Sequence, residues 1–315
     1  MWGAIIGDII GSRFENENIF SEHFELFENN CVFTDDTVMT VATLMILQNY
    51  DKDKITPNII VHEYRKLGCG YLQRGFGGMF YQWLVTYNQG AYGSYGNGAL
   101  MRISPLAKWA VDNSWTKQEM IDMSERFTNV THNHTQALSA VNLYLSILYD
   151  LMIGLKNTDD YAEREKKSRE IIRGLIDDTA WSKIEQPRYF KILNTKETNL
   201  SCEYTLQAVL SVLKNTIENK DTSYTYKFEY GIKKMVSVGG DCDTTAAILG
   251  PILEIIYNIV PAFKYSAYKI AFKDYDQPLI DAMNAFYKED IRNDSIYIMP
   301  NLITDLNLDR NKDED

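Results

Sequence analysis

The chain has 315 residues, a mass of 36.3 kDa and a formal net charge of −11 at pH 7. Apolar residues make up 45% of it and charged residues 24%, as in an ordinary globular protein, and a chain of this length needs no disulfide or metal for stability alone. The acidic balance and the lack of a basic stripe argue against general nucleic-acid binding. An anionic ligand would therefore need bound cations or converging backbone N–H groups.

The cysteines and the apolar segments bear on the compartment. The four cysteines are scattered and form no CxxC pair: Cys31, Cys69, Cys202 and Cys242. This favours reduced thiols in a cytoplasmic protein. The apolar N-terminus lacks a basic region and carries Asp8, so it does not resemble a signal peptide. Charged residues or proline interrupt the apolar segments 138–154 and 246–262, which are expected to be core helices and not membrane spans.

In chain order, the first element is expected to be a closely packed helix. Gly3, Gly7 and Gly11 recur at four-residue spacing, which gives a helix one flat face for another helix to pack against. Asp8 lies in this segment, and Glu15 follows seven residues later, on roughly the same face if the helix continues. Either carboxylate could point into a pocket. The alternatives are a capping hydrogen bond for Asp8 and a surface position for Glu15.

Helix signals dominate the rest of the chain. Residues 38–50 form a long apolar segment, and Thr56-Pro57 opens the next helix with an N-cap and a proline in the first turn. Thr116 and Glu119 form a capping box. Further helices are expected at 136–154, 158–176, 203–217, 244–259 and 277–288. Because alternating strand patterns are scarce, the sequence predicts an all-α fold.

Nothing in the sequence divides the chain into separate domains. No linker separates two halves, and no repeat of solenoid period is visible. A single domain is therefore expected over residues 1–300. The tail from 301 to 315 is acidic and lacks apolar anchors, so it is expected to be disordered.

An acidic cluster, Thr34-Asp35-Asp36-Thr37, directly precedes the apolar segment at 38–50. Read alone, it is a helix cap. Thr34 would be the N-cap, and the two aspartates would lie in the first turn, where the helix macrodipole favours negative charge.

A second acidic cluster, Asp241-Cys242-Asp243-Thr244, repeats this layout before another very apolar segment. Four carboxylates near two buried helix ends would repel one another and lose much of their hydration. Cations remove that problem, and carboxylate and hydroxyl oxygens suit hard ions such as Mg²⁺, Mn²⁺ or Ca²⁺. The two clusters are therefore predicted to meet around divalent metal ions, with Cys242 as a structural residue.

Two further segments fit a ligand pocket. Glycines in the segment 93–99 would let the backbone approach a ligand, and successive N–H groups can bind an anion, although a tight turn is the alternative. The segment Thr131-His132-Asn133-His134 directly precedes an expected helix. A lone HxH pair usually binds no metal, so His132 is expected to donate a hydrogen bond to a ligand and His134 to be structural.

Taken together, these segments resemble the ADP-ribosylglycohydrolase family, which includes the dinitrogenase-reductase-activating glycohydrolase and the ADP-ribosyl-serine and -arginine hydrolases. The matching motifs, in the family's order between residues 3 and about 253, are GAIIGDIIGSRFE, FTDDTVMT, GSYGNGALMRISPLA, THNHTQA and SVGGDCDTTAAILGPI. Each motif is weak alone. TDDT and GGDxDT at this separation, with YGNGxxMR between them, form a highly specific combination.

The resemblance implies a compact, orthogonal multi-helix bundle around two divalent cations, Mg²⁺ or Mn²⁺. The metal ligands that it implies are Thr34, Asp35, Asp36, Asp241, Asp243 and Thr244. The residues that it places at the diphosphate and ribose are Gly93, Ser94, Tyr95, Asn97 and Gly98, with His132 touching the phosphate. The cations could orient a water and lower its pKa, and Asp36 or Glu15 could assist proton transfer. Which of these two carboxylates is the base stays open.

The implied function is hydrolysis of the N- or O-glycosidic bond that links ADP-ribose to a protein side chain or a small molecule, with release of ADP-ribose. The implied partner is therefore an ADP-ribosylated protein or a small ADP-ribose conjugate. The alternatives are a catalytically silent ADP-ribose-binding or structural protein on the same fold, and a metal-dependent phosphohydrolase. Intact acidic clusters favour an enzyme. The sequence indicates neither the leaving group nor the oligomeric state, and the loops 16–31 and 68–92 are candidates for specificity.

Overall fold

The computed structural model describes residues 1–176, 200–259 and 261–292. Within these ranges every regular element is helical, and extended backbone pairs only in an isolated antiparallel bridge between Gly96 and Ser201. The prediction of an all-α fold is confirmed. The α-helices are α1 (Trp2–Gly11), α2 (Asp35–Asn49), α3 (Pro57–Cys69), α4 (Gly78–Val85), α5 (Gly98–Met101), α6 (Ser104–Asp112), α7 (Lys117–Asn129), α8 (Thr135–Leu155), α9 (Tyr161–Ile176), α12 (Cys202–Glu218), α13 (Lys227–Val238), α14 (Cys242–Tyr257), α15 (Pro261–Ala271) and α16 (Gln277–Tyr287). Short 3-10 helices are η1 (Ser12–Phe14), η2 (Lys52–Lys54), η4 (Tyr224–Tyr226) and η5 (Asp274–Asp276).

Three of the helix starts that carry a side-chain cap were predicted from the sequence. Thr34 and Thr56 are the N-caps of α2 and α3, and Thr116 and Glu119 form the capping box of α7. The helices that the sequence did not predict include α4, α5, α6 and α13, and none of these four has a side-chain hydrogen bond at its N-cap. Their starts therefore lack a side-chain cap, although α6 carries Pro105 in its first turn, and packing against the rest of the protein helps to define them.

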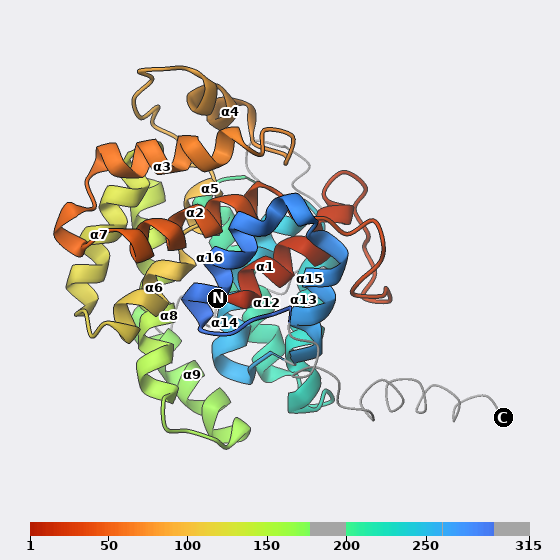
Figure 1. Ribbon diagram of the computed structural model, residues 1–315. Helices are drawn as coiled ribbons and strands as arrows, with labels where there is room; N and C mark the ends of the chain where they lie inside the picture. The colour runs from red at the N-terminus through yellow and green to blue at the C-terminus, as the bar shows by residue number, and fades with distance from the viewer. Residues whose placement is uncertain (177–199, 260, 293–315) are drawn as a thin grey trace.

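Helices α1 and α14 cross the centre of the molecule and lie against each other in antiparallel directions (Figure 1). Every residue of α1 is buried. A Cβ atom added at Gly3 would lie 2.2 Å from the carbonyl oxygen of Gly250, and one added at Gly7 would lie 2.2 Å from that of Ala246. The predicted flat glycine face is therefore a close helix–helix contact, and it brings the C-terminal end of α1 to the N-terminal end of α14.

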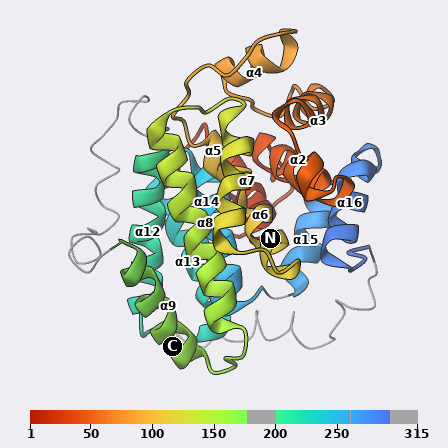
Figure 2. The ribbon, with the colours of Figure 1, turned by 90° about the vertical axis from the view of Figure 1, so that its left-hand side faces the viewer.

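Helix α8 is long and apolar enough to cross a membrane by length and composition, and 44% of its most apolar window is buried. Figure 2 shows it among other helices, and it packs against α6, α7, α9, α12 and α14. Core helices commonly pass the same length and composition test. The contacts of α8 agree with the expectation of a core helix over residues 138–154.

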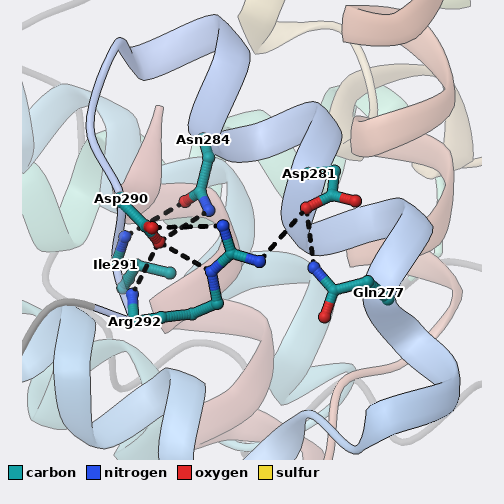
Figure 3. Close-up of polar contacts among 6 residues, drawn as sticks. All are labelled: Gln277, Asp281, Asn284, Asp290, Ile291 and Arg292. Carbon is teal, nitrogen blue, oxygen red and sulfur yellow. Dashed lines mark hydrogen bonds and ion pairs between the residues drawn. The ribbon is translucent and has the colours of Figure 1, made fainter.

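The described part of the chain ends in a turn after α16. Arg292 bonds to Asp290, with 2.7 Å between Nε and Oδ1, and its Nη1 lies 3.5 Å from Asp281 on α16 (Figure 3). Asn284 also bonds to Asp290. These exposed contacts hold the turn against α16. The predicted disordered tail at 301–315 lies outside the described residues.

Candidate metal centre and ligand site

Two groups of carboxylates meet where the N-termini of α2 and α14 reach the end of α1. The first group is Asp8, Asp36 and Asp243, and the second is Glu15, Asp241 and Asp243. Within each group, one oxygen from each residue lies within 4.8 Å of the others. Asp243 belongs to both groups, so the five carboxylates form one continuous acidic centre. The two sequence clusters, about 200 residues apart, therefore come together as predicted.

Asp8 anchors this centre from α1. Its buried carboxylate accepts hydrogen bonds from the backbone amide of Thr34 (3.0 Å to Oδ2) and from the Thr34 hydroxyl (2.7 Å to Oδ1). It also accepts from the backbone amide of Thr37 (3.0 Å) and from the Thr37 hydroxyl. Asp8 thus accepts hydrogen bonds from backbone amides at the start of α2, which is the capping role considered from the sequence. It is also one of the clustered carboxylates.

Asp36 lies in the first turn of α2 and is buried. Its Oδ2 accepts a hydrogen bond from the hydroxyl of Thr244 (3.1 Å), which links the two sequence clusters, and lies 3.3 Å from the hydroxyl of Thr34. Its Oδ1 is buried and has no hydrogen-bond partner. An unpaired carboxylate oxygen deep in a protein is unfavourable unless another group compensates it. A cation would supply that compensation.

Asp35 and Asp241 lie at the edge of the centre and are only partly buried. The Asp35 backbone amide donates to the carbonyl of Arg74 at 2.8 Å, so α2 starts against the loop that precedes α4. The Asp241 carboxylate accepts from Nδ2 of Asn97 at 2.7 Å. That bond joins the acidic centre directly to the predicted glycine-rich ligand loop.

The carboxylates perturb one another strongly. Burial, followed by repulsion from neighbouring aspartates, raises the pKa of Asp35, Asp36 and Asp243 well above the usual value near 3.8. Burial also raises the pKa of Asp8, although the hydrogen bonds from Thr34 and Thr37 oppose it. The cluster thus tends to hold protons when no cation is bound. Its donors are all oxygens, which fits a hard divalent cation and not zinc.

Glu15 lies after η1, at the exposed edge of the centre. Helix α1 ends at Gly11, so Glu15 does not continue its face, and a 3-10 turn carries it towards Asp241 instead. Partial removal from water, followed by repulsion from Asp241 and Asp8, raises its pKa. Glu15 is the most accessible of the five carboxylates.

The loop at 93–98 is tied to neighbouring segments. Gly93 has a φ of +67°, and its amide donates to Oδ1 of Asn133 at 2.7 Å. The Gly96 amide donates to Ser94 Oγ at 3.2 Å, and the Asn97 amide donates to the carbonyl of Leu200 at 2.7 Å. These three amides are therefore engaged within the protein. An anion would have to use other groups of the loop.

The two histidines lie in different environments. His132 is 3% exposed, and its Nε2 faces Gly98, where an added Cβ would lie 3.4 Å away. His134 is exposed and accepts a hydrogen bond from the Gln136 amide at 3.2 Å as the N-cap of α8. The Tyr95 ring is 47% exposed and lies 5.2 Å from that of His134, centroid to centroid, so it borders the site from outside.

The structure adds residues that the sequence did not single out. Asn18 bonds to both backbone groups of Gly240, its Nδ2 to the carbonyl (2.9 Å) and its Oδ1 to the amide (2.8 Å). Gly75 lies beside Asp35, whose Oδ1 is 3.4 Å from the position of a Cβ at that glycine. The predicted loops 16–31 and 68–92 therefore both reach the acidic centre, although the second contains the end of α3 and the whole of α4. No local pattern marks either residue, because each acts on a partner distant in the chain.

Comparisons with known proteins agree with this geometry. The sequence profile of the ADP-ribosylglycohydrolase family matches residues 1–262. Among solved structures, the chain is similar to an ADP-ribosylglycohydrolase-related protein complex, with a TM-score of 0.60 and 19% identity over 92% of this chain and 95% of that chain. At this identity the likeness shows a shared fold. A comparison with curated proteins found no match. Since the profile covers most of the sequence, the chain belongs to the ADP-ribosylglycohydrolase family.

Proposed function

We propose that the protein is a metal-dependent hydrolase that cleaves the N- or O-glycosidic bond of ADP-ribose attached to a protein side chain or a small molecule. The observation that carries this proposal is that five carboxylates form one acidic centre, in which Asp243 belongs to both groups. This centre lies beside the glycine-rich loop 93–98, whose Asn97 donates a hydrogen bond to Asp241. Family membership supports a hydrolase of the ADP-ribosylglycohydrolase type.

Two divalent cations, Mg²⁺ or Mn²⁺, are proposed to bind the acidic centre. The proposed ligands are the six residues implied by the motifs: Thr34, Asp35, Asp36, Asp241, Asp243 and Thr244. Asp8 holds Thr34 in place through hydrogen bonds to its amide and hydroxyl. When bound, the cations would offset the carboxylate charge, attract the hydroxyls of the substrate ribose and acidify a water.

A carboxylate with a raised pKa is suited to accept a proton near neutral pH. Asp36 offers an unpaired buried oxygen, and Glu15 offers an accessible carboxylate at the edge of the centre. Either could take a proton from the attacking water while the bond at the anomeric carbon breaks through an oxocarbenium-like state. Ser94, Asn97 and His132 are proposed to hold the diphosphate and ribose so that this carbon faces the acidic centre.

The leaving group would be selected by the loops 16–31 and 68–92, since Asn18 and Gly75 place them against the acidic centre. A panel of defined substrates tests this directly. ADP-ribose linked to arginine, serine, an acetyl ester or a nucleic-acid base would each be incubated with the protein and Mg²⁺ or Mn²⁺, and free ADP-ribose measured. We expect release from at least one linkage and no release after chelation.

Asp36→Ala and Asp243→Asn should each abolish that release while the protein stays folded by circular dichroism. Full activity in both variants would overturn the assignment. Metal-dependent binding of ADP-ribose with no turnover on any linkage would instead select the silent binding protein. Release of AMP and ribose phosphate in place of intact ADP-ribose would select a phosphohydrolase.

A further inference from the structure

Arg102 is a buried cation close to the ligand site. Its side chain is 1% exposed and lies over the ring of Tyr64, with 4.8 Å from Cζ to the ring centroid. Its Nη2 donates to the hydroxyl of Thr131 at 2.7 Å and to the carbonyl of Phe127 at 3.4 Å. No ion pair joins Arg102 to a carboxylate in the described part of the chain. The guanidinium thus donates to Thr131 and has no carboxylate partner among the described residues to neutralise its charge.

The hydroxyl of Thr131 in turn contacts His132, with 2.7 Å between Oγ1 and Nδ1. Arginine can only donate hydrogen bonds, so the Thr131 oxygen accepts from Arg102 and keeps its own hydrogen available. If Nδ1 also carried a proton, the Thr131 hydrogen would have no partner in this buried place. The arrangement is satisfied when Thr131 donates to an unprotonated Nδ1.

The proton of a neutral imidazole must then sit on Nε2. This nitrogen faces the glycine loop, 3.4 Å from the position of a Cβ at Gly98 and 4.0 Å from one at Gly96. It has no hydrogen-bond partner among the described residues. Glycine at these two positions leaves space in front of it, so Nε2–H can reach a ligand in the loop.

We infer that Arg102 and Thr131 are positioning residues that fix His132 as a neutral imidazole with its proton on Nε2, directed at the diphosphate of a bound ADP-ribose. The identity of that ligand rests on the proposed function, whereas the tautomer does not. Burial, with a smaller contribution from the Arg102 charge, lowers the pKa of His132 well below its usual value near 6.5, which agrees with a neutral ring. His132 then donates a hydrogen bond from Nε2 to the ligand and carries no positive charge of its own.

The tautomer can be measured without any ligand. Long-range ¹H–¹⁵N correlation spectra of uniformly labelled protein at pH 7 show which imidazole nitrogens carry a proton, and His132→Asn identifies the His132 signals. We expect an unprotonated Nδ1 and a protonated Nε2. A His132 ring protonated on Nδ1, or on both nitrogens, would overturn the inference.

Thr131→Val removes the hydroxyl with little change in volume, and we expect His132 to lose its single tautomer. Thr131→Ser keeps a hydroxyl and should restore it, which also keeps the test open if the valine variant does not fold. The matched control is Thr128→Val, since the Thr128 hydroxyl is equally buried but bonds to the Ser124 carbonyl at 2.7 Å. An unchanged tautomer in folded Thr131→Val would contradict the role of Thr131.

Affinity for ADP-ribose, measured by calorimetry with Mg²⁺ present, separates this inference from the proposed function. Loss of one directed hydrogen bond to a charged ligand predicts roughly tenfold weaker binding in Thr131→Val, with wild-type affinity in Thr131→Ser and Thr128→Val. If the wild type binds no ADP-ribose, the proposed function fails while the spectra still decide the tautomer. If the wild type binds and Thr131→Val binds equally well, the positioning role fails alone.

Discussion

Asp243 is the carboxylate shared by both groups of the acidic centre, so Asp243→Asn perturbs the whole centre with one isosteric change. The Asn Oδ1 can still accept the hydrogen bond that Oδ1 of Asp243 receives from the Thr244 amide at 2.9 Å. The fold should therefore be kept. We expect two opposite effects: the cation-free protein becomes more stable, because repulsion falls, and the stabilisation by Mg²⁺ or Mn²⁺ is largely lost.

The magnitudes follow from the spacing of the carboxylates. Two unit charges separated by the 4.8 Å limit of each group repel by about 3.5 kcal/mol at an effective dielectric constant near 20. Glu15 and Asp241 are exposed or partly exposed to water, which raises the effective dielectric constant around the centre, so the relief is smaller, about 1–2 kcal/mol. At roughly 2 °C per kcal/mol for a chain of this size, the Tm of the cation-free variant should rise by about 2–4 °C.

The cation effect is larger. A cation at 100 times its Kd stabilises the wild type by about 2.7 kcal/mol, which corresponds to a Tm increase of roughly 5 °C. A hundredfold loss of affinity in Asp243→Asn would leave about 0.4 kcal/mol at the same concentration, which is less than about 1 °C. Without the cation the variant should therefore have the higher Tm, and with the cation the wild type should gain far more in Tm than the variant.

The assay is differential scanning calorimetry of chelator-treated protein, titrated with MgCl₂ or MnCl₂. The matched control is Asp53→Asn, which removes one exposed carboxylate in η2, and both of its Tm values should follow the wild type. The reasoning is refuted if Asp243→Asn keeps the full cation-induced increase in Tm. A cation-free variant less stable than the wild type would equally contradict the repulsion that we infer.

Two further predictions concern pH and packing. The folded-state pKa values of Asp8, Asp36 and Asp243 are raised above the ordinary 3.8, so the folded protein holds these protons more tightly than the unfolded chain. The resulting contribution to the free energy of unfolding is complete below about pH 3.8 and is lost as the pH rises through the raised values. Urea unfolding from pH 4 to 8 should therefore show cation-free protein losing stability relative to Mg²⁺-saturated protein as pH rises; a constant difference would contradict this. Gly7→Ala should destabilise the protein by about 3 kcal/mol in urea, because its Cβ would meet the Ala246 carbonyl at 2.2 Å, whereas Gly174→Ala in open space on α9 should stabilise by about 0.5–1 kcal/mol. Equal effects of the two substitutions would refute the close α1–α14 contact.

The parts of the fold that the sequence predicted well depend on local chemistry. An N-cap and its amide partner lie two or three residues apart, so Thr34, Thr56 and Thr116 could be identified as helix starts from the sequence alone. Helices without such caps, such as α4 and α13, gave no comparable signal. The meeting of the two acidic clusters was predicted by a different argument, namely the high free energy of burying several carboxylates without cations.

Contacts between distant parts of the chain could not be predicted in this way. Asp8 accepts hydrogen bonds from residues 26 and 29 positions away, and Asn18 holds Gly240 at a separation of 222 residues. The sequence offered both a capping and a pocket role for Asp8; the structure shows the capping bonds and places Asp8 among the clustered carboxylates. Asn18 has no distinguishing pattern, since an asparagine in a loop has many possible partners.

The glycine stripe of α1 shows how a packing feature can determine the geometry of a site. Its spacing predicted close contact with another helix but not which one, and the partner is α14, which starts at the second acidic cluster. A Cβ at Gly11 would lie 2.6 Å from the Cα of Asp243, so the two backbones meet where the carboxylates converge. Because the backbones meet there, the small residues that bring the two helices together also bring Asp8 and Asp243 within 4.8 Å of each other, which is the spacing of the proposed cation site.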